Sequence, residues 1–304
     1  MRSSSSIVSL VTAIVAILCG LGASPDAQVF KTGVETVEVT VTVTDAAGRL
    51  IGGLKADDFE VFEDGDPQPI KHFTGDRVPL SLGMLVDISD SMRGKPIVDA
   101  RAALTHFVGE LLDRRDEVFL GTFNHVPQPI TAWMRPPSEV QGALDSRQPS
   151  GGTAIYDAIV ASLDAFGRRD NGRAALVVIS DGADTASDIS VRQAQDRLRR
   201  TDAFVYAIAI DAEGAQRRTT RVNPDALREL TAPTGGYTEV VQSAGDLPVA
   251  TERIALELNA QYSLGYVAPR PADGRWRSVR VRAKGEGLIT RSRRGYYATP
   301  TYRR

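Results

Sequence analysis

One stretch decides the fold: Leu82-Gly83-Met84-Leu85-Val86 runs directly into Asp87-Ile88-Ser89-Asp90-Ser91. The first half is short and almost wholly apolar, as expected for a strand buried on both faces of a parallel sheet. Beyond the polar turn, apolar residues recur at helical spacing between Ile97 and Leu111, which predicts an amphipathic helix. A buried strand, a polar turn and a helix in this order are the repeating unit of an α/β fold.

The same unit recurs between Pro79 and about Asn259. The apolar run 174–179 is the clearest of the further strands, and the alternation of strands with helices predicts a doubly wound, mostly parallel sheet. The other expected elements are strands at 118–123 and 204–210, an edge strand at 129–133, and helices at 154–166, 191–200, from Asp225, and 247–258.

The two flanks of this region have a different period. Residues 37–44 alternate valine with threonine or glutamate, and residues 262–267 and 276–283 also alternate. A period of two with one apolar face is typical of antiparallel sheets or sandwiches. The sequence therefore predicts a signal segment (1–23), an N-terminal β segment (24–78), an α/β domain (79–260) and a C-terminal β segment (261–304).

The flanks also differ in charge. Residues 24–78 contain 11 acidic and 5 basic residues, whereas residues 270–304 contain 11 basic and 2 acidic ones. Arg277, Arg280 and Arg282 fall among apolar strand residues, which favours a solvated face over a surface for anions. The acidic and basic strands could instead pair with each other, making one β-sandwich that the α/β domain interrupts.

The composition excludes several classes of protein. With 304 residues, of which 42% are hydrophobic and 24% charged, the sequence is ordinary for a globular chain of about two domains. The net charge of −2 gives no general case for nucleic acid binding. Three histidines and one cysteine, Cys19, exclude a zinc finger, a disulfide scaffold and an iron–sulfur protein.

The N-terminus has the pattern of an export signal. Arg2 precedes an apolar run from Ile7 to about Leu21, which ends in small residues near Ala23. Because this run is at or below the length that a spanning helix needs, we expect cleavage near Ala23 and an exported chain, secreted or periplasmic. The alternative is an uncleaved N-terminal helix that anchors the chain to the membrane.

Three short polar motifs follow strands or open helices. They are Asp87-x-Ser89-x-Ser91, the threonine of Gly151-Gly152-Thr153, and the aspartate of Ile179-Ser180-Asp181-Gly182. Taken singly, each is also what an ordinary helix cap or turn contains. Together they would bring three hydroxyls and two carboxylates to the carboxyl edge of the sheet, where open α/β sheets bind ligands.

The donor set of these motifs indicates the kind of ligand. Hard oxygen donors suit Mg²⁺, Mn²⁺ or Ca²⁺ and do not suit zinc or copper. If the neutral hydroxyls are direct ligands and the aspartates mainly orient water, the ion stays under-neutralised. An open coordination position would then favour a carboxylate from another molecule.

The set Asp87, Ser89, Ser91, Thr153 and Asp181 resembles the metal-ion-dependent adhesion site of the von Willebrand factor type A (vWA) family. The resemblance covers roughly residues 79–260. It implies a divalent cation, most simply Mg²⁺, with the three hydroxyls as direct ligands and a protein partner that supplies an Asp or Glu. The flanking stretches 57–61, 262–266 and 294–297 resemble those of exported bacterial proteins with a vWA-related domain.

The alternatives to this hypothesis are an enzyme and a purely structural protein. The sequence contains no phosphate-binding loop, dinucleotide fingerprint, G-x-S-x-G or H-E-x-x-H motif, so we expect no catalytic activity. A structural or assembly protein of the cell envelope would use the same metal ligands only to hold the three loops together. The ligands themselves serve both roles equally well.

Overall fold

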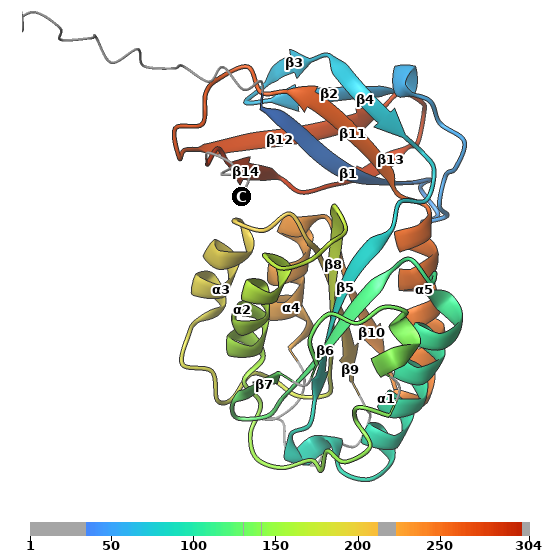
Figure 1. The fold of residues 1–304 in the computed structure, drawn as a ribbon, viewed down its shortest axis with the longest axis vertical. Helices are drawn as coiled ribbons and strands as arrows, with labels where there is room; N and C mark the ends of the chain where they lie inside the picture. Colours follow the sequence, from blue (N-terminus) through green and yellow to red (C-terminus); the bar gives the residue numbers. More distant parts are fainter. Residues whose placement is uncertain (1–34, 130, 141, 212–222, 300–304) are drawn as a thin grey trace, which may run out of the picture. The chain divides into compact units, whose positions relative to one another are not determined.

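The structure is a computed structural model that describes residues 35–129, 131–140, 142–211 and 223–299. The expected signal segment and Cys19 lie outside the described residues. Both ends of the described part belong to β-strands or their flanks, and the long α/β region lies between them in the sequence (Figure 1).

A six-stranded sheet forms the centre of the α/β region, in the order β10-β9-β8-β5-β6-β7. Every neighbouring pair is parallel except β6 and β7, which are antiparallel. The four central strands are buried along their whole length, as their apolar sequences require. The strands are Leu80–Asp87 (β5), Glu117–Phe123 (β6), Pro127–Pro129 (β7), Arg173–Ser180 (β8), Phe204–Ile210 (β9) and Thr238–Val241 (β10).

Helices cover both faces of this sheet, which confirms the doubly wound α/β fold (Figure 1). One face packs against α1 (Lys95–His106) and α5 (Leu247–Asn259). The other packs against α2 (Ile155–Phe166), α3 (Val191–Leu198) and α4 (Pro224–Thr231). The two faces draw on alternate strand residues, because successive side chains of a strand point in opposite directions.

Three details of the α/β region differ from the expectation. The edge strand is Pro127–Pro129 rather than 129–133, and only an isolated bridge joins Val118 to Met134. Prolines fit an edge strand because they have no N–H to donate. The first helix ends at His106 and continues as a π-helical turn through Leu111, and β10 is a short strand that the sequence analysis did not identify.

The two flanks pair with each other strand by strand. One sheet has the order β13-β1-β11-β4 and the other β14-β12-β2-β3. Their apolar faces share a single core, which contains Val39 and Leu264 from one sheet and Val61 and Val281 from the other. The strands are Thr36–Thr44 (β1), Phe59–Glu63 (β2), Asp66–Gln68 (β3), Ile70–Thr74 (β4), Tyr262–Val267 (β11), Trp276–Ala283 (β12), Ile289–Arg291 (β13) and Gly295–Tyr297 (β14).

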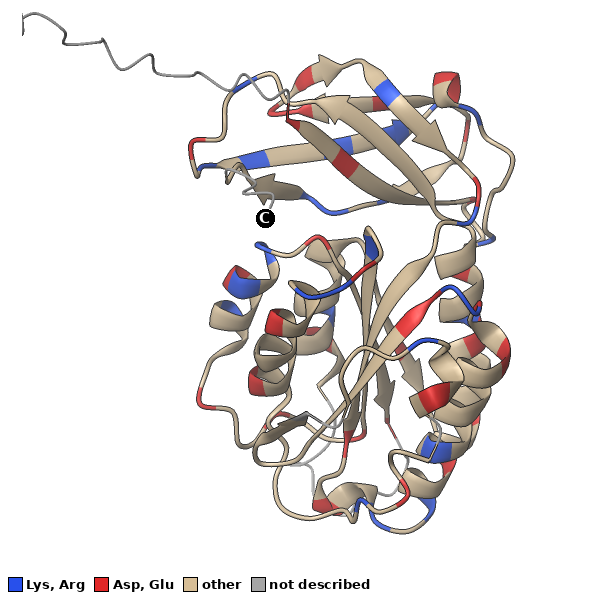
Figure 2. Ribbon diagram, in the orientation of Figure 1, with Lys and Arg blue, Asp and Glu red and all other residues tan. Residues whose placement is uncertain are grey.

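Acidic and basic residues lie on neighbouring segments of this sandwich (Figure 2). Arg282 on β12 donates to Glu60 on β2, with Nε and Oε2 2.7 Å apart, and Arg270 lies 2.6 Å from Asp64. The expectation of a solvated face is wrong for Arg277, which is 5% exposed and bonds to Asp273. Arg277 shares the strand parity of the buried valines of β12, so the same alternation places it inward.

A buried polar network joins the sandwich to the α/β region. Glu257 of α5 accepts hydrogen bonds from Tyr206 of β9 at 2.9 Å and from Thr42 of β1 at 3.1 Å. Gln261 donates to the hydroxyl oxygens of both Thr42 and Tyr206, and Arg291 of β13 pairs with Glu257. Because all these groups are satisfied by one another, the network fixes α5 against strands of both regions.

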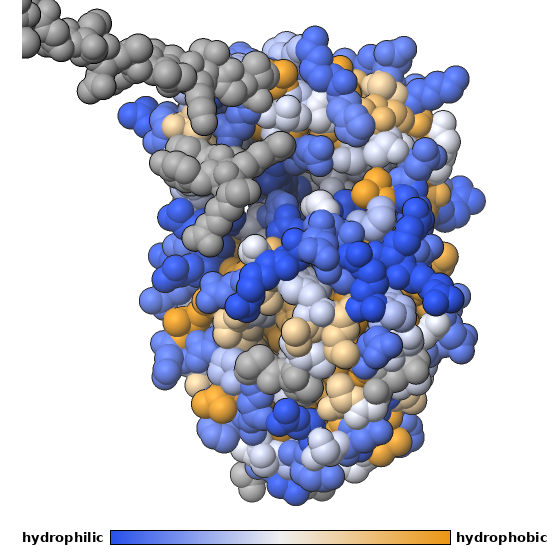
Figure 3. All heavy atoms as spheres, viewed as in Figure 1, coloured by the Kyte–Doolittle hydropathy of each residue, from blue (hydrophilic) through white to orange (hydrophobic). Residues whose placement is uncertain are grey.

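The apolar surface of the described residues is scattered. The exposed large apolar side chains are Val98, Val126, Val249, Leu256 and Ile289, which lie on several different elements. On the face shown in Figure 3, hydrophilic residues predominate and apolar ones form small separate groups. Among the described residues, none of the helices has both the length and the hydrophobicity needed to cross a membrane.

Candidate metal centre

Three loops bring the five expected ligand residues to the carboxyl edge of the sheet. Asp87 is the last residue of β5, and Ser89 and Ser91 belong to the turn that follows it. Asp181 comes directly after β8, the neighbour of β5. Thr153 lies in the loop before α2. Parallel strands end at the same edge, which explains why residues 94 positions apart along the chain meet.

The side chains of these residues form one hydrogen-bonded cluster. The Ser91 hydroxyl donates to Asp181 Oδ1 at 2.7 Å, and the Ser89 and Ser91 hydroxyl oxygens are 3.0 Å apart. The backbone N–H of Ser89 donates to Asp87 Oδ1 at 2.7 Å. Ser91 is exposed and Asp181 is half-buried, so the cluster is open to solvent on this side.

Gly182 shows that the Thr153 hydroxyl belongs to the same cluster. A Cβ added to this glycine would lie 3.1 Å from Thr153 Oγ1 and 3.7 Å from Ser91 Oγ. The two hydroxyls therefore face the same small space, and the glycine leaves that space free. A side chain at this position would enter the cradle that the five residues form.

The helix-cap interpretation does not account for these hydroxyls. The residue that caps α1 is Gly94 and the residue that caps α2 is Ala154, so neither Ser89 nor Thr153 is an N-cap of these helices. Ser89 precedes the short 3₁₀ turn Asp90–Met92, but its side chain makes no capping hydrogen bond there. The hydroxyls are directed to the cluster instead of to the helix ends.

Backbone hydrogen bonds tie the three loops together. Asp90 N donates to Gly151 O at 2.9 Å, which joins the first loop to the second. Thr185 N donates to Thr153 O at 2.8 Å, and Thr153 N donates to the Thr185 hydroxyl at 3.0 Å, which joins the second loop to the third. The positions of the five oxygen donors are therefore set by the protein before any ligand binds.

Burial leaves the negative charge of the cluster poorly compensated. Asp87 is completely buried, and loss of hydration raises its pKa from 3.8 to about 7, in spite of hydrogen bonds from Ser180 and Ser89. Desolvation also raises the pKa of Asp181. No basic side chain of the described residues pairs with either carboxylate within 4 Å. A divalent cation would supply the missing positive charge.

Two residues of the centre were not identified from the sequence. The Ser180 hydroxyl donates to Asp87 Oδ2 at 2.5 Å and accepts from Gly182 N at 3.2 Å, so it fixes the orientation of the buried carboxylate. Thr185 holds the backbone of Thr153, as described above. Both are ordinary polar residues close to a loop, and their only sequence signal is their proximity to Asp181.

The donor set fits a hard divalent cation. Three hydroxyls and two carboxylates provide only oxygen, which is the coordination that Mg²⁺ and Ca²⁺ prefer. Within the described residues there is no group of three or more His, Cys, Asp or Glu side chains that could hold a metal without hydroxyl ligands. Besides the two aspartates, the cluster offers a metal the hydroxyl oxygens of Ser89, Ser91 and Thr153.

Substitution of Gly182 by alanine should weaken divalent-cation binding several-fold, with little change in fold. The added Cβ would crowd Thr153 Oγ1 at 3.1 Å and narrow the space between the two hydroxyls. Gly182 does not have the positive φ that only glycine tolerates, so backbone strain is not expected. Calorimetric titration of Mg²⁺ into both proteins measures the effect, and equal affinities would show that the ion does not use this space.

Comparisons with known proteins identify the fold of this region. A von Willebrand factor type A protein from Catenulispora acidiphila has a similar structure, with a TM-score of 0.54 and 10% sequence identity over 88% of this chain and 75% of that one. Proximal thread matrix protein 1 from the mussel byssus matches with a TM-score of 0.51 and 15% identity, over 63% of this chain and 49% of that one. At these identities the likeness concerns the fold alone.

The curated proteins provide no match to the sequence. The model of the von Willebrand factor type A domain matches residues 82–252, which is more than half of the chain and includes all five residues of the cluster. The chain therefore belongs to the von Willebrand factor type A domain family.

Proposed function

We propose that this protein is a divalent-cation-dependent protein-binding module whose metal ion coordinates an acidic residue of the partner. The observation that carries the proposal is the cluster of Asp87, Ser89, Ser91, Thr153 and Asp181, which directs five oxygen donors into one solvent-open cradle. Mg²⁺ is the favoured ion because it needs few protein ligands and keeps several waters, one of which a carboxylate of the partner can replace.

The chemistry of the cradle favours binding over catalysis. Both oxygens of Asp87 already accept hydrogen bonds, from Ser89 N and from the Ser180 hydroxyl, and one oxygen of Asp181 accepts from Ser91. These carboxylates are thus engaged in positioning the loops rather than held ready to move a proton. A metal with neutral hydroxyl ligands has positive charge left over, which an incoming carboxylate neutralises.

We also propose that the protein is exported and acts in the cell envelope or outside the cell. The N-terminal pattern of a basic residue, an apolar run and small residues supports this location.

The second candidate function is a structural protein in which the ion only joins the three loops. The hydrogen bonds between these loops support it, because a bound ion would add to contacts that already hold the loops together. A joining ion would raise the free energy of unfolding in the absence of any partner, whereas a recognition ion would in addition retain a coordination position for one. Partner binding distinguishes the two.

The direct test is selection of peptide ligands from a random library in Mg²⁺, followed by elution with a chelator. Eluted peptides should share an Asp or Glu, and replacement of that residue by its amide should abolish binding. The Ser91→Ala protein should capture none of them, whereas the Ser150→Ala protein, changed at an exposed serine of the Thr153 loop outside the cluster, should capture them all. Peptides that bind equally in chelator, or after the amide replacement, would refute the proposal.

A further inference from the structure

A second polar site lies at the other end of β8, where the α/β region meets the sandwich. An enclosed cavity of about 50 Å³ is lined there by Glu38 and Thr40 of β1, by Arg173 at the start of β8, and by Asp202, Phe204 and Arg293. This volume is large enough for a small ion or several waters. Two of the lining residues are arginines.

Arg173 is a buried cation with only neutral partners. It is 8% exposed, and its guanidinium donates to Val78 O, to Leu258 O and to Gln261 Oε1. Its Nε is buried and has no hydrogen-bond partner among the described residues. No carboxylate of those residues lies within 4 Å, and burial lowers the pKa of Arg173 to about 10.

Arg293 lines the same cavity and, like Arg173, has a buried nitrogen without a hydrogen-bond partner among the described residues. One of its terminal nitrogens donates to Glu38 O at 2.7 Å, and its guanidinium lies 5.4 Å from the ring centre of Tyr296. Its Nε is also buried without a partner in the described part of the chain. Burial lowers the pKa of Arg293 as well, which indicates a cation with incomplete compensation.

The two acidic residues of the cavity do not neutralise this pair of cations. Asp202 is exposed and bonds to Arg169, with the two atoms 2.5 Å apart. Glu38 is exposed, and its backbone carbonyl, not its carboxylate, contacts Arg293. The negative charges of Asp202 and Glu38 favour the charged form of Arg293 through long-range electrostatic attraction. Neither carboxylate forms an ion pair with Arg173 or Arg293.

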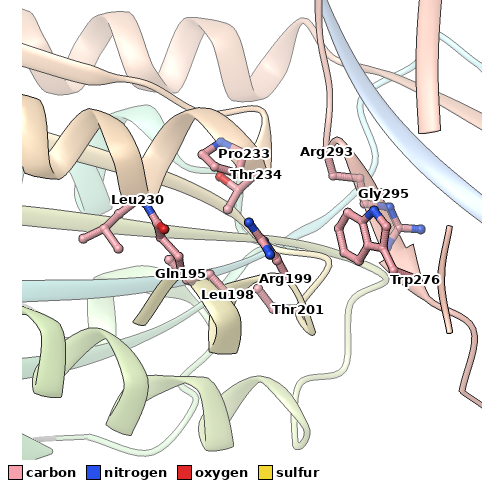
Figure 4. A pocket seen from close by; sticks show the side chains of 10 residues that line it. All are labelled: Gln195, Leu198, Arg199, Thr201, Leu230, Pro233, Thr234, Trp276, Arg293 and Gly295. Carbon is pink, nitrogen blue, oxygen red and sulfur yellow. The ribbon is translucent and has the colours of Figure 1, made fainter. Parts of the chain in front are cut away.

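An open pocket lies beside the cavity. This pocket has a volume of about 370 Å³ and shares Glu38, Asp202 and Arg293 with the cavity. Its lining also contains Arg199 and Arg200, together with Glu35. Figure 4 shows an adjoining gap of about 10 Å³, where Arg293 and Trp276 lie across from Arg199.

We propose that this cavity binds a small inorganic anion between Arg173 and Arg293. Arg173 is buried and Arg293 half-buried, and each has a buried Nε–H without an acceptor among the described residues, which is costly; an anion placed between the two guanidinium groups offsets that cost. The anion would join β8 of the α/β region to the segment after β13 of the sandwich. Because Asp181 and Arg173 stand at opposite ends of β8, the site is about 25 Å from the metal centre and independent of it.

The test has a structural arm and a thermodynamic arm. Crystals grown in sodium bromide should show an anomalous peak in the cavity between the two arginines. In thermal unfolding at constant ionic strength, chloride should raise the Tm of the full chain saturably, by about 2–4 °C relative to gluconate. Phosphate and sulfate, tested separately, distinguish a preference for oxyanions from one for halides.

Arg293→Gln should abolish the anion-specific rise in Tm. Arg280→Gln is the matched control. Arg280 is exposed, lies over the ring of Phe62 and does not line the cavity, so this variant should keep the anion-specific rise in Tm. Water alone in the cavity of the bromide crystals would overturn the proposal even if the arginine variant does not fold. So would an equal rise in Tm for the Arg293→Gln protein.

Discussion

Replacing both Ser89 and Ser91 by alanine should abolish saturable Mg²⁺ binding while the fold persists. The two hydroxyls are neighbours in the cluster, 3.0 Å apart, and together supply two of the three neutral donors. Loss of well-placed oxygen ligands should lower the ion affinity by at least about 100-fold, since even changes to groups that only support metal ligands cost 10–100-fold. Calorimetric titration of Mg²⁺, Mn²⁺ and Ca²⁺ into both proteins measures this directly.

The same double variant should unfold almost as the parent does when both are in chelator. Ser91 is exposed, and each lost hydrogen bond is worth only about 1 kcal/mol, so the free energy of unfolding should fall by no more than about 2 kcal/mol. Ser150→Ala is the control, because Ser150 lies in the same loop as Thr153 and its hydroxyl accepts from Asn124, which is outside the cluster. Unchanged Mg²⁺ affinity in the double variant would remove the basis of the metal site.

Much of the α/β region could be predicted because its strands are buried on both faces. Such strands read as continuous apolar runs, and the rule that parallel strands end at one edge then brings Asp87 and Asp181 together. Short edge elements lack this signal. β10 has four residues, most of them half-buried, and β7 has three, so neither forms a recognisable run.

The strand pairing of the sandwich could not be predicted from the sequence. A period of two indicates which face of a strand is buried, but it does not say which strand is the neighbour, so the pairing of β1 with β11 and β2 with β12 was left open. The contacts that join the regions are also long-range. In the sequence Glu257 is one of two acidic residues of a helix, and only the fold brings Tyr206 and Thr42 to its carboxylate.

Within the candidate metal centre, the clustering of the expected ligand residues could be predicted, and the residues that hold them in place could not. Asp87, Ser89 and Ser91 form a motif of fixed spacing, whereas the side chains of Ser180 and Thr185 each make one hydrogen bond to a residue from another part of the chain. Their role depends on which side chain lies opposite. That information is absent from local sequence, because a serine before an aspartate is common in any strand-to-loop turn.

Without a divalent ion, the protein should become less stable as the pH rises from about 4 to about 7, because of Asp87. The folded-state pKa of this group is about 7, above its ordinary value of 3.8. Below pH 4 the carboxyl is protonated in both states and the native state has its full stability. Between the two values the unfolded chain releases the proton and the native chain keeps it, so the free energy of unfolding falls with rising pH.

The expected loss is at most about 4 kcal/mol, since each unit of pKa difference corresponds to about 1.4 kcal/mol. Other carboxyl groups also make the stability depend on pH in this range. The lowered pKa of Asp113, for example, makes the free energy of unfolding rise with pH. The quantity to measure is therefore the difference in the free energy of unfolding between the wild type and Asp87→Asn. Denaturant unfolding of both proteins in chelator, across this pH range, gives that difference. If the difference in the free energy of unfolding between the two proteins did not change with pH, the pKa of Asp87 would be the same in the native and unfolded states, and the prediction would be wrong.

Saturating Mg²⁺ should reduce this fall in the wild type and leave the Asp87→Asn protein nearly unchanged. A cation beside the carboxylate stabilises its charged form, so the native pKa of Asp87 drops toward that of the unfolded chain and the penalty above it disappears. The effects of pH and of metal on the free energy of unfolding therefore have one cause. The buried Asp87 carboxylate that destabilises the metal-free protein is the charge that would attract the ion. If Mg²⁺ raised stability equally in both proteins, the ion would be acting elsewhere than at Asp87.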